Sequence, residues 1–136
     1  MRVEVAMPFE ALDYVYMPSR DVAADARFLT DVLGGRLVFA IDAMGTRVAM
    51  IELSETPPPI LLASHLARDR PILIYRVADL AAATAELAGR GWEAELTVEI
   101  PVGPCSVFEL PGGQRFAIYE RSRPDVVEHF AGRRDF

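Results

Sequence analysis

Tyrosine and arginine side chains on strand-like stretches are the residues of this sequence best suited to bind a small molecule. A tyrosine ring offers a flat apolar face with a hydroxyl that can orient a ligand. An arginine can stack on a planar ligand or bind a carboxylate with two N–H groups. Alternate residues of a strand face the same side. The candidate ligand-binding residues on three such stretches are Tyr14 and Tyr16, then Ile72, Ile74 and Arg76, and finally Ala117 and Tyr119.

Residues suited to acid–base or nucleophilic catalysis are few. The two histidines, His65 and His129, are far apart in the sequence, and we expect both to be exposed. Glu99 and Glu109 lie on neighbouring strand-like stretches and form a candidate acid–base pair, although strands commonly present glutamates to solvent. Cys105 has no Lys or His within several residues to lower its pKa, which disfavours a nucleophilic role. The sequence assigns no catalytic residue.

The elements that position these residues occur twice. In each half an apolar stretch ends in a polar turn closed by an aspartate, and Asp79 follows Asp21 by 58 residues. Each aspartate precedes a helical pattern and is a favourable N-cap. The motif Ile-Glu-Leu at 51–53 is matched by Phe-Glu-Leu at 108–110, an offset of 57 residues. This period predicts a duplicated supersecondary unit.

Both units have the predicted order β-α-β-β-β. The strands of the first are expected over residues 12–17, 36–41, 47–53 and 60–64, and those of the second over residues 72–77, 94–100, 106–110 and 115–120. The turns of the second unit are expected at 101–104 and at 111–113, the latter a glycine hairpin. The first helix is expected to end at Gly34 and Gly35, and its apolar positions recur at three-to-four spacing: Val22, Ala26, Leu29 and Leu33.

A unit of this kind covers one sheet face with its helix and leaves the other open. The predicted fold class is therefore α+β: two tandem βαβββ modules forming a curved mixed sheet, an open barrel, around a cleft with the helices outside. The modules span residues 11–66 and 70–121. Residues 122–136 form a C-terminal extension of mixed charge, whose apolar anchors Phe130 and Phe136 are expected to pack on the barrel or on a neighbouring chain.

The composition excludes several classes of protein. At 136 residues, 51 % of them hydrophobic, the chain fits one globular domain, 1–136, with a real core. A net charge of −6 argues against nucleic acid as a partner. No apolar run reaches the roughly 18 residues of a membrane span, and residues 1–10 are a short leader without a signal-peptide core. The single cysteine excludes an internal disulfide and fits the cytoplasm.

Residues 12–121 resemble the vicinal oxygen chelate superfamily, the group of glyoxalases, bleomycin-resistance proteins and extradiol dioxygenases. The resemblance is carried by the strand-then-aspartate helix start in both halves and by the ending PGGQRFAIYE at 111–120, which is similar to the family's proline–glycine turn and last strand. The resemblance implies a half-barrel fold, a small organic molecule as partner, and a possible homodimer.

The resemblance also implies where a metal would be bound. In metal-dependent members, His or Glu ligands occupy the start of the first strand and the inside of the last strand of each half. The corresponding residues here are Tyr14, Ile72, Ala117, and either Leu61 or Leu62. Aliphatic side chains offer no donor atom, and a phenol is a poor ligand at neutral pH because its pKa is about 10. We therefore expect no metal and no other cofactor.

Three functions remain open. The first is metal-independent binding of a small, partly aromatic organic ligand in the sheet cleft, as in bleomycin resistance. The second is a lyase, isomerase or dioxygenase of the same superfamily with a non-standard or absent metal site. The third is a structural or regulatory subunit with a blocked cleft. The lack of metal-ligating side chains at the family's metal positions favours the first of these functions, metal-independent binding.

A single substitution tests the assignment of these positions. Tyr14→His is expected not to create tight metal binding, because the other three positions stay aliphatic. Isothermal titration with Ni²⁺ and Zn²⁺ measures this, with the unmodified protein as control. A sub-micromolar affinity in the variant would contradict the assignment.

Overall fold

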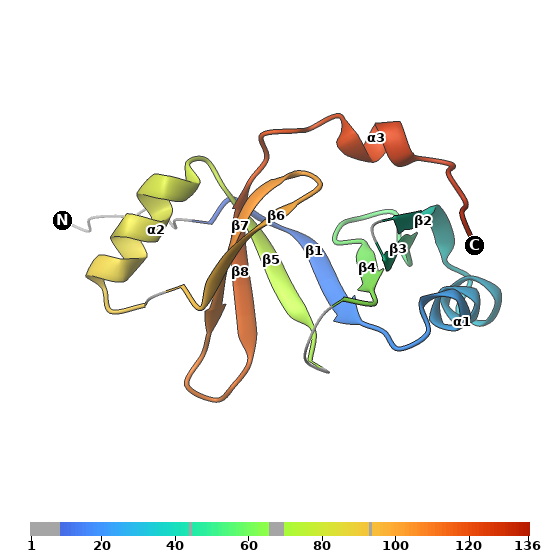
Figure 1. Cartoon of the computed structure of the whole chain (residues 1–136), viewed down its shortest axis with the longest axis horizontal. Coiled ribbons are helices and arrows are strands. Elements are labelled where there is room, and N and C mark those ends of the chain that lie inside the picture. The colour runs from blue at the N-terminus through green and yellow to red at the C-terminus, as the bar shows by residue number, and fades with distance from the viewer. Residues whose placement is uncertain (1–8, 44, 66–69, 93) are drawn as a thin grey trace.

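The computed structural model describes residues 9–43, 45–65, 70–92 and 94–136. In these ranges eight strands form one mixed sheet with the order β2-β3-β4-β1-β5-β8-β7-β6. The predicted α+β fold is confirmed: the sheet curls into a half-barrel, and helices α1 and α2 lie at opposite ends of the molecule (Figure 1). The predicted leader, residues 1–10, lies mostly outside the described residues. Residues 66–69, at the junction of the two predicted modules, do so entirely, and the module bounds stay predictions.

The order of elements repeats as β-α-β-β-β. The first set is β1 (Ala11–Pro18), α1 (Val22–Arg27) continued by the π-helical turn η1 (Phe28–Val32), β2 (Arg36–Ala43), β3 (Thr46–Glu52) and β4 (Ile60–Ala63). The second is β5 (Ile72–Val77), α2 (Leu80–Gly89), β6 (Leu96–Ile100), β7 (Gly103–Glu109) and β8 (Arg115–Glu120), followed by α3 (Val126–Phe130). The first strands of the two sets, β1 and β5, pair antiparallel at the centre of the sheet.

The helix starts confirm the repeat at atomic detail. The carboxylate of Asp21 accepts a hydrogen bond from the backbone N–H of Ala24 at 3.0 Å. The carboxylate of Asp79 accepts the equivalent bond from Ala82, also at 3.0 Å. Each bond satisfies a backbone donor that the helix leaves without an intrahelical partner.

The end of the first helix differs from the prediction. After Arg27 the helix widens into a π-helical turn, in which the N–H of Leu33 bonds to the carbonyl of Phe28 at 3.2 Å. The wider turn rotates the following positions out of phase with the three-to-four apolar spacing. Leu29 therefore still packs on the core, whereas Leu33 is 56 % exposed. The packed face of the helix therefore does not extend to Leu33, although this residue continues the three-to-four apolar spacing.

The turn between β6 and β7 is also shorter than predicted. Ile100 pairs with Gly103, so the loop is only Pro101 and Val102 rather than the four residues 101–104. Gly103 permits this because it has no Cβ to collide with the carbonyl of Glu120 at the end of β8. The glycine hairpin predicted at 111–113 is present, with the N–H of Gly113 bonded to the carbonyl of Leu110 at 2.9 Å.

Alternating side chains divide the core into layers on the two sides of the sheet. On the convex side, one cluster lies beneath α1 around Val22 and Ile51, and another beneath α2 around Leu87 and Phe108. On the concave side, a larger cluster runs across both modules and includes the predicted cleft residues of β1, β5 and β8. In the part of the chain that the structure describes, no helix is long and apolar enough to cross a membrane.

The C-terminal segment packs on the barrel, which is one of the two arrangements predicted for it. Phe130 of α3 lies on Phe39 with ring centroids 5.8 Å apart. Beyond α3, the N–H of Ala40 donates to the carbonyl of Arg133 at 2.8 Å, and the N–H of Asp135 donates to the carbonyl of Ala40 at 2.7 Å. The segment thus pairs with the free edge of β2 and covers it.

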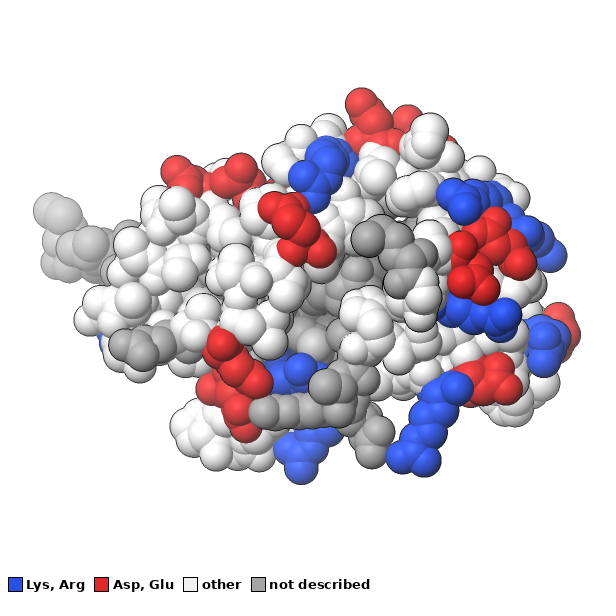
Figure 2. Space-filling view, in the orientation of Figure 1, with Lys and Arg blue, Asp and Glu red and all other residues white. Residues whose placement is uncertain are grey.

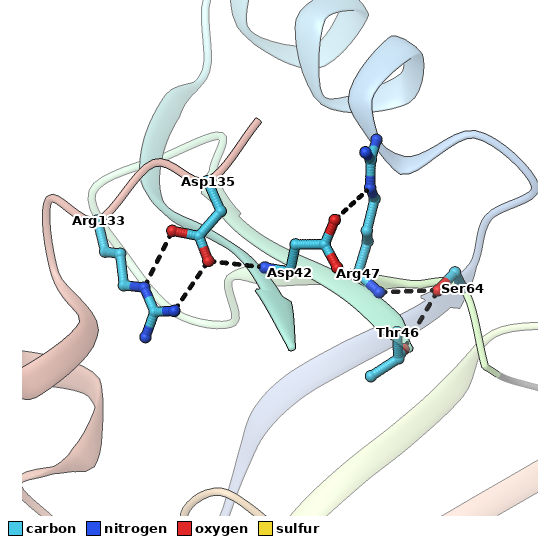
Figure 3. A network of polar contacts seen from close by, with 6 residues as sticks. All are labelled: Asp42, Thr46, Arg47, Ser64, Arg133 and Asp135. Atoms are coloured by element: carbon cyan, nitrogen blue, oxygen red, sulfur yellow. Dashed lines mark hydrogen bonds and ion pairs between the residues drawn. The ribbon is translucent and has the colours of Figure 1, made fainter. Parts of the chain in front are cut away.

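A polar network fixes the end of this segment (Figure 3). The guanidinium of Arg133 holds the carboxylate of Asp135, and this hydrogen bond lowers the pKa of Asp135. One oxygen of that carboxylate also accepts a bond from the N–H of Asp42 at 2.9 Å. Asp42 in turn bonds Arg47 at 3.1 Å, so the last residues are tied to the β2–β3 hairpin.

Two glycines at neighbouring hairpins form a matched test of this packing. A Cβ on Gly103 would lie 1.9 Å from the carbonyl oxygen of Glu120, whereas a Cβ on Gly112 would meet nothing within 4 Å. We expect Gly103→Ala to lower the free energy of unfolding by about 2–3 kcal/mol, because the β7 backbone must move away from β8. Gly112→Ala should change it by less than about 1 kcal/mol. Urea unfolding measures both, and equal stabilities would contradict the close approach.

Candidate ligand-binding cleft

The structure places the predicted site residues on the concave face of the sheet. Six of them belong to one buried cluster: Tyr14, Tyr16, Ile72, Ile74, Ala117 and Tyr119. They meet because Tyr16 pairs with Ile72 across β1 and β5, and Ile74 pairs with Ala117 across β5 and β8. The seventh, Arg76, shares this face but lies at its end, next to Tyr119.

The half of the cleft over the first module is filled by the chain itself. Helix α3 and the β6–β7 loop pack onto it, and they leave a space of about 20 Å³. That volume holds little more than one water molecule. Tyr14 faces this filled half, whose covering residues are Val126, Val127, Phe130, Pro101 and Val102.

The half over the second module is open. A cavity of about 390 Å³ lies on the concave face between β5, β8, β7 and the edge strand β6, within the range of roughly 300–1,000 Å³ typical of small-molecule sites. The surface is hollowed near the centre of the molecule, where the two modules meet (Figure 2). The cavity lining is mostly apolar: Tyr16, Ile72, Ile74, Ala117, Cys105, Val107, Leu96, Val98 and Ile100, with His65, Glu99 and Arg115 as its polar members.

Arg115 is the functional candidate that sequence reasoning missed. It begins β8, is only 6 % exposed, and lines the cavity. Its Nε and Nη2 atoms are buried and have no hydrogen-bond partner among the described residues. The signal was present in the sequence, because Arg115, Ala117 and Tyr119 alternate and so share one face of β8.

Arg76, the arginine that the sequence favoured, is held by carboxylates outside the cavity. Its guanidinium forms ion pairs with Glu10 at 3.3 Å and with Asp13 at 3.5 Å. The Tyr119 hydroxyl donates a hydrogen bond to the same oxygen of Asp13. Asp13 reaches this position because the register of β1 shifts by a bulge between Leu12 and Tyr14.

The candidate acid–base pair of glutamates is not formed. Glu99 lies opposite Pro104 and forms an ion pair with Arg123 at 2.6 Å. Glu109 lies opposite Arg115, at the other end of β7. Both glutamates lie on neighbouring strands, but the register separates them along the strands. Both are exposed, as strands commonly present glutamates to solvent.

The remaining titratable candidates differ in their access to the cavity. His65 is exposed at the cavity rim, and its Nδ1 lies 2.9 Å from the hydroxyl of Thr46. His129 is exposed on α3 with its ring edge on Phe130. Burial raises the pKa of Cys105 to about 12, so at neutral pH this thiol is protonated and a poor nucleophile.

The residues at the family's metal positions do not fit a divalent ion. Tyr14, Ile72, Leu61 and Ala117 all point into the concave cluster, whereas Leu62 faces the convex side, so Leu61 takes the fourth position. Three aliphatic side chains provide no donor, and burial raises the pKa of Tyr14 further above its ordinary value. The described residues contain no group of three His, Cys, Asp or Glu side chains able to hold a metal.

A family model covers most of the chain. Residues 11–118 match the model described as glyoxalase/bleomycin resistance protein/dioxygenase superfamily. The chain belongs to this superfamily. The match confirms the resemblance drawn from the repeated aspartates and the last strand, and no curated protein matches the sequence.

Solved structures support the glyoxalase fold of the chain. Methylmalonyl-CoA epimerase from Mycobacterium tuberculosis superimposes with a TM-score of 0.66 at 21 % identity, covering 90 % of this chain and 95 % of that one. A hypothetical protein from Bacillus halodurans gives 0.68 at 15 % identity, with 83 % and 95 % covered. A variant of the Streptomyces coelicolor epimerase, in complex with 2-nitronate-propionyl-CoA, gives 0.68 at 15 % identity, with 84 % and 99 % covered. At these identities the likeness shows the fold alone.

The buried phenols and thiol predict sensitivity of the fold to alkali. Burial raises the pKa of Tyr14, Tyr16, Tyr119 and Cys105. In the unfolded chain these groups lose protons near pH 9–10, whereas in the folded chain they keep them to higher pH. Their contribution to the free energy of unfolding is therefore complete below about pH 8 and is lost progressively above about pH 9–10.

Urea unfolding at a series of pH values measures this effect, with tyrosinate absorbance recorded in parallel. We expect the absorbance of these three phenols to appear only as the protein unfolds. Tyr119→Phe removes one of the groups, so its stability should fall less steeply with pH. Ionisation of every tyrosine near pH 10 in the folded protein would contradict the burial.

Proposed function

We propose that this protein binds a small, partly aromatic organic molecule without a metal, in the cavity between β5, β8, β7 and β6. The observation that carries the proposal is the open cavity of about 390 Å³ on the concave face. Its walls are mainly aliphatic, and Tyr16 offers a ring at the boundary between the filled and open halves. An apolar ligand gains roughly 25 cal/mol for each Å² of apolar surface removed from water.

The position of the C-terminal segment supports a binding role over a structural subunit with a blocked cleft. Helix α3 and the β6–β7 loop occupy only the first-module half. The second-module half keeps its cavity. The buried Arg115 lies within it, and its Nε and Nη2 have no hydrogen-bond partner among the residues that the structure describes. A structural subunit with a blocked cleft would have this half filled as well.

A second candidate is a lyase or isomerase of the same superfamily that works without the usual metal ligands. The observation that favours it is that His65 and Glu99, two groups able to exchange protons, line the same cavity. Metal analysis of the purified protein separates the two candidates if the enzyme uses a non-standard metal site. Near-stoichiometric Zn, Ni, Mn or Fe would favour the enzyme.

A cavity-filling substitution tests the proposed site. Ala117 is 1 % exposed at the cavity wall, so Ala117→Leu should reduce the cavity and weaken binding by at least about tenfold, or about 1.4 kcal/mol. Ala82→Leu, on the exposed surface of α2, is the matched control and should bind normally. A thermal-shift screen of aromatic compounds selects the probe, and isothermal titration gives its Kd. Equal Kd values for Ala117→Leu and the unmodified protein would place binding elsewhere.

A further inference from the structure

Arg115 is the most unusual charged residue of the cavity. A guanidinium is always protonated in proteins, and only 6 % of this residue is exposed. Burying a cation without hydrogen bonds is strongly unfavourable. Yet Nε and Nη2 of Arg115 find no hydrogen-bond partner in the described parts of the chain. Natural proteins retain such unfavourable groups mainly where function requires them.

The two unpartnered atoms define the kind of group that would satisfy them. Nε–H and one N–H of Nη2 point in the same direction in the plane of the guanidinium, as one edge of its fork of donors. The two oxygens of a carboxylate match this edge with two parallel hydrogen bonds. A neutral amide has a single acceptor oxygen, so it cannot accept two parallel hydrogen bonds from Nε and Nη2.

The charges around the cavity place this anion at one end. Arg115 pairs with Ile72 of β5 and Glu109 of β7, at the start of β8. Glu99 lies at the opposite end, five residue steps along the strands, which is roughly 16 Å at about 3.3 Å per residue. A ligand with its negative charge at Arg115 therefore keeps that charge away from Glu99. Glu109, although opposite Arg115, is exposed and is not among the residues that line the cavity. The apolar walls between them strengthen the attraction at the cationic end by lowering the local dielectric.

We propose that the ligand is an organic carboxylate whose two oxygens accept hydrogen bonds from Nε and Nη2 of Arg115. Its apolar, partly aromatic body lies along Ile72, Ile74 and Ala117 beneath β6. This inference rests on the proposed function, since it specifies the chemical class of the molecule that the same cavity binds. It assigns to Arg115 the orienting role that the sequence suggested for Arg76.

A matched pair of probes tests the assignment: a naphthalene carboxylic acid and the corresponding naphthalene carboxamide, which have the same shape. Isothermal titration of the unmodified protein should show the acid binding at least about tenfold more tightly than the amide. In Arg115→Met, which keeps the apolar stem, the acid should lose this advantage while the amide still binds. Arg36→Met removes an exposed arginine paired with Glu52 and should leave both affinities unchanged.

Each outcome bears on one of the two claims. Equal binding of acid and amide to the unmodified protein overturns the carboxylate inference and leaves the proposed function standing. Binding of neither probe overturns the proposed function, and the inference with it. An acid preference that persists in Arg115→Met overturns the role of Arg115.

The melting temperature of Arg115→Met provides an independent readout. Because Nε and Nη2 of Arg115 have no hydrogen-bond partner among the described residues, replacing the guanidinium by an apolar side chain should leave the melting temperature unchanged or raise it. A fall of more than about 10 °C would show that Arg115 supports the fold and would overturn the inference. Arg115→Lys keeps the charge without the two-donor edge, so it should retain only part of the preference for the acid.

Discussion

The antiparallel pairing of β1 with β5 is the interaction on which the rest of the structure depends. Each set of four strands covers one of its faces with a helix and leaves the other open. The central pairing joins the two open faces into one concave surface, in which Tyr16 meets Ile72 and Tyr14 meets Ile74. Burial of that surface both stabilises the fold and creates the cleft, so the site is a consequence of how the halves are joined.

The cleft is then divided by the last residues of the chain. Helix α3 seals the first-module half, anchored by Phe130 on Phe39 and by the backbone bonds between the following residues and β2. The tight β6–β7 loop completes that seal and leaves the second-module half open. The symmetry of the repeat is thereby broken, since one half has become hydrophobic core and the other a cavity with a buried arginine.

Much of this could be predicted from the sequence because local chemistry repeats. Asp21 and Asp79 cap equivalent helices, and alternating residues in β1, β5 and β8 place the predicted side chains on one face. The sequence could not predict that Arg115 rather than Arg76 lines the cavity. This difference depends on contacts of Arg76 with Glu10 and Asp13 that arise from a bulge and from the pairing of distant strands. The exposure of Leu33 likewise depends on a π-helical turn that apolar spacing does not reveal.

The central claim is that the second-module cavity binds its ligand through an apolar wall and one buried cation rather than through a metal. A crystal structure of the protein with a bound aromatic carboxylate tests this most directly. We expect ring density between β5 and β6, with both carboxylate oxygens on Nε and Nη2 of Arg115 and no metal ion in the cleft. Side chains gripping a metal ion inside the cleft, or a ligand bound outside it, would contradict the account.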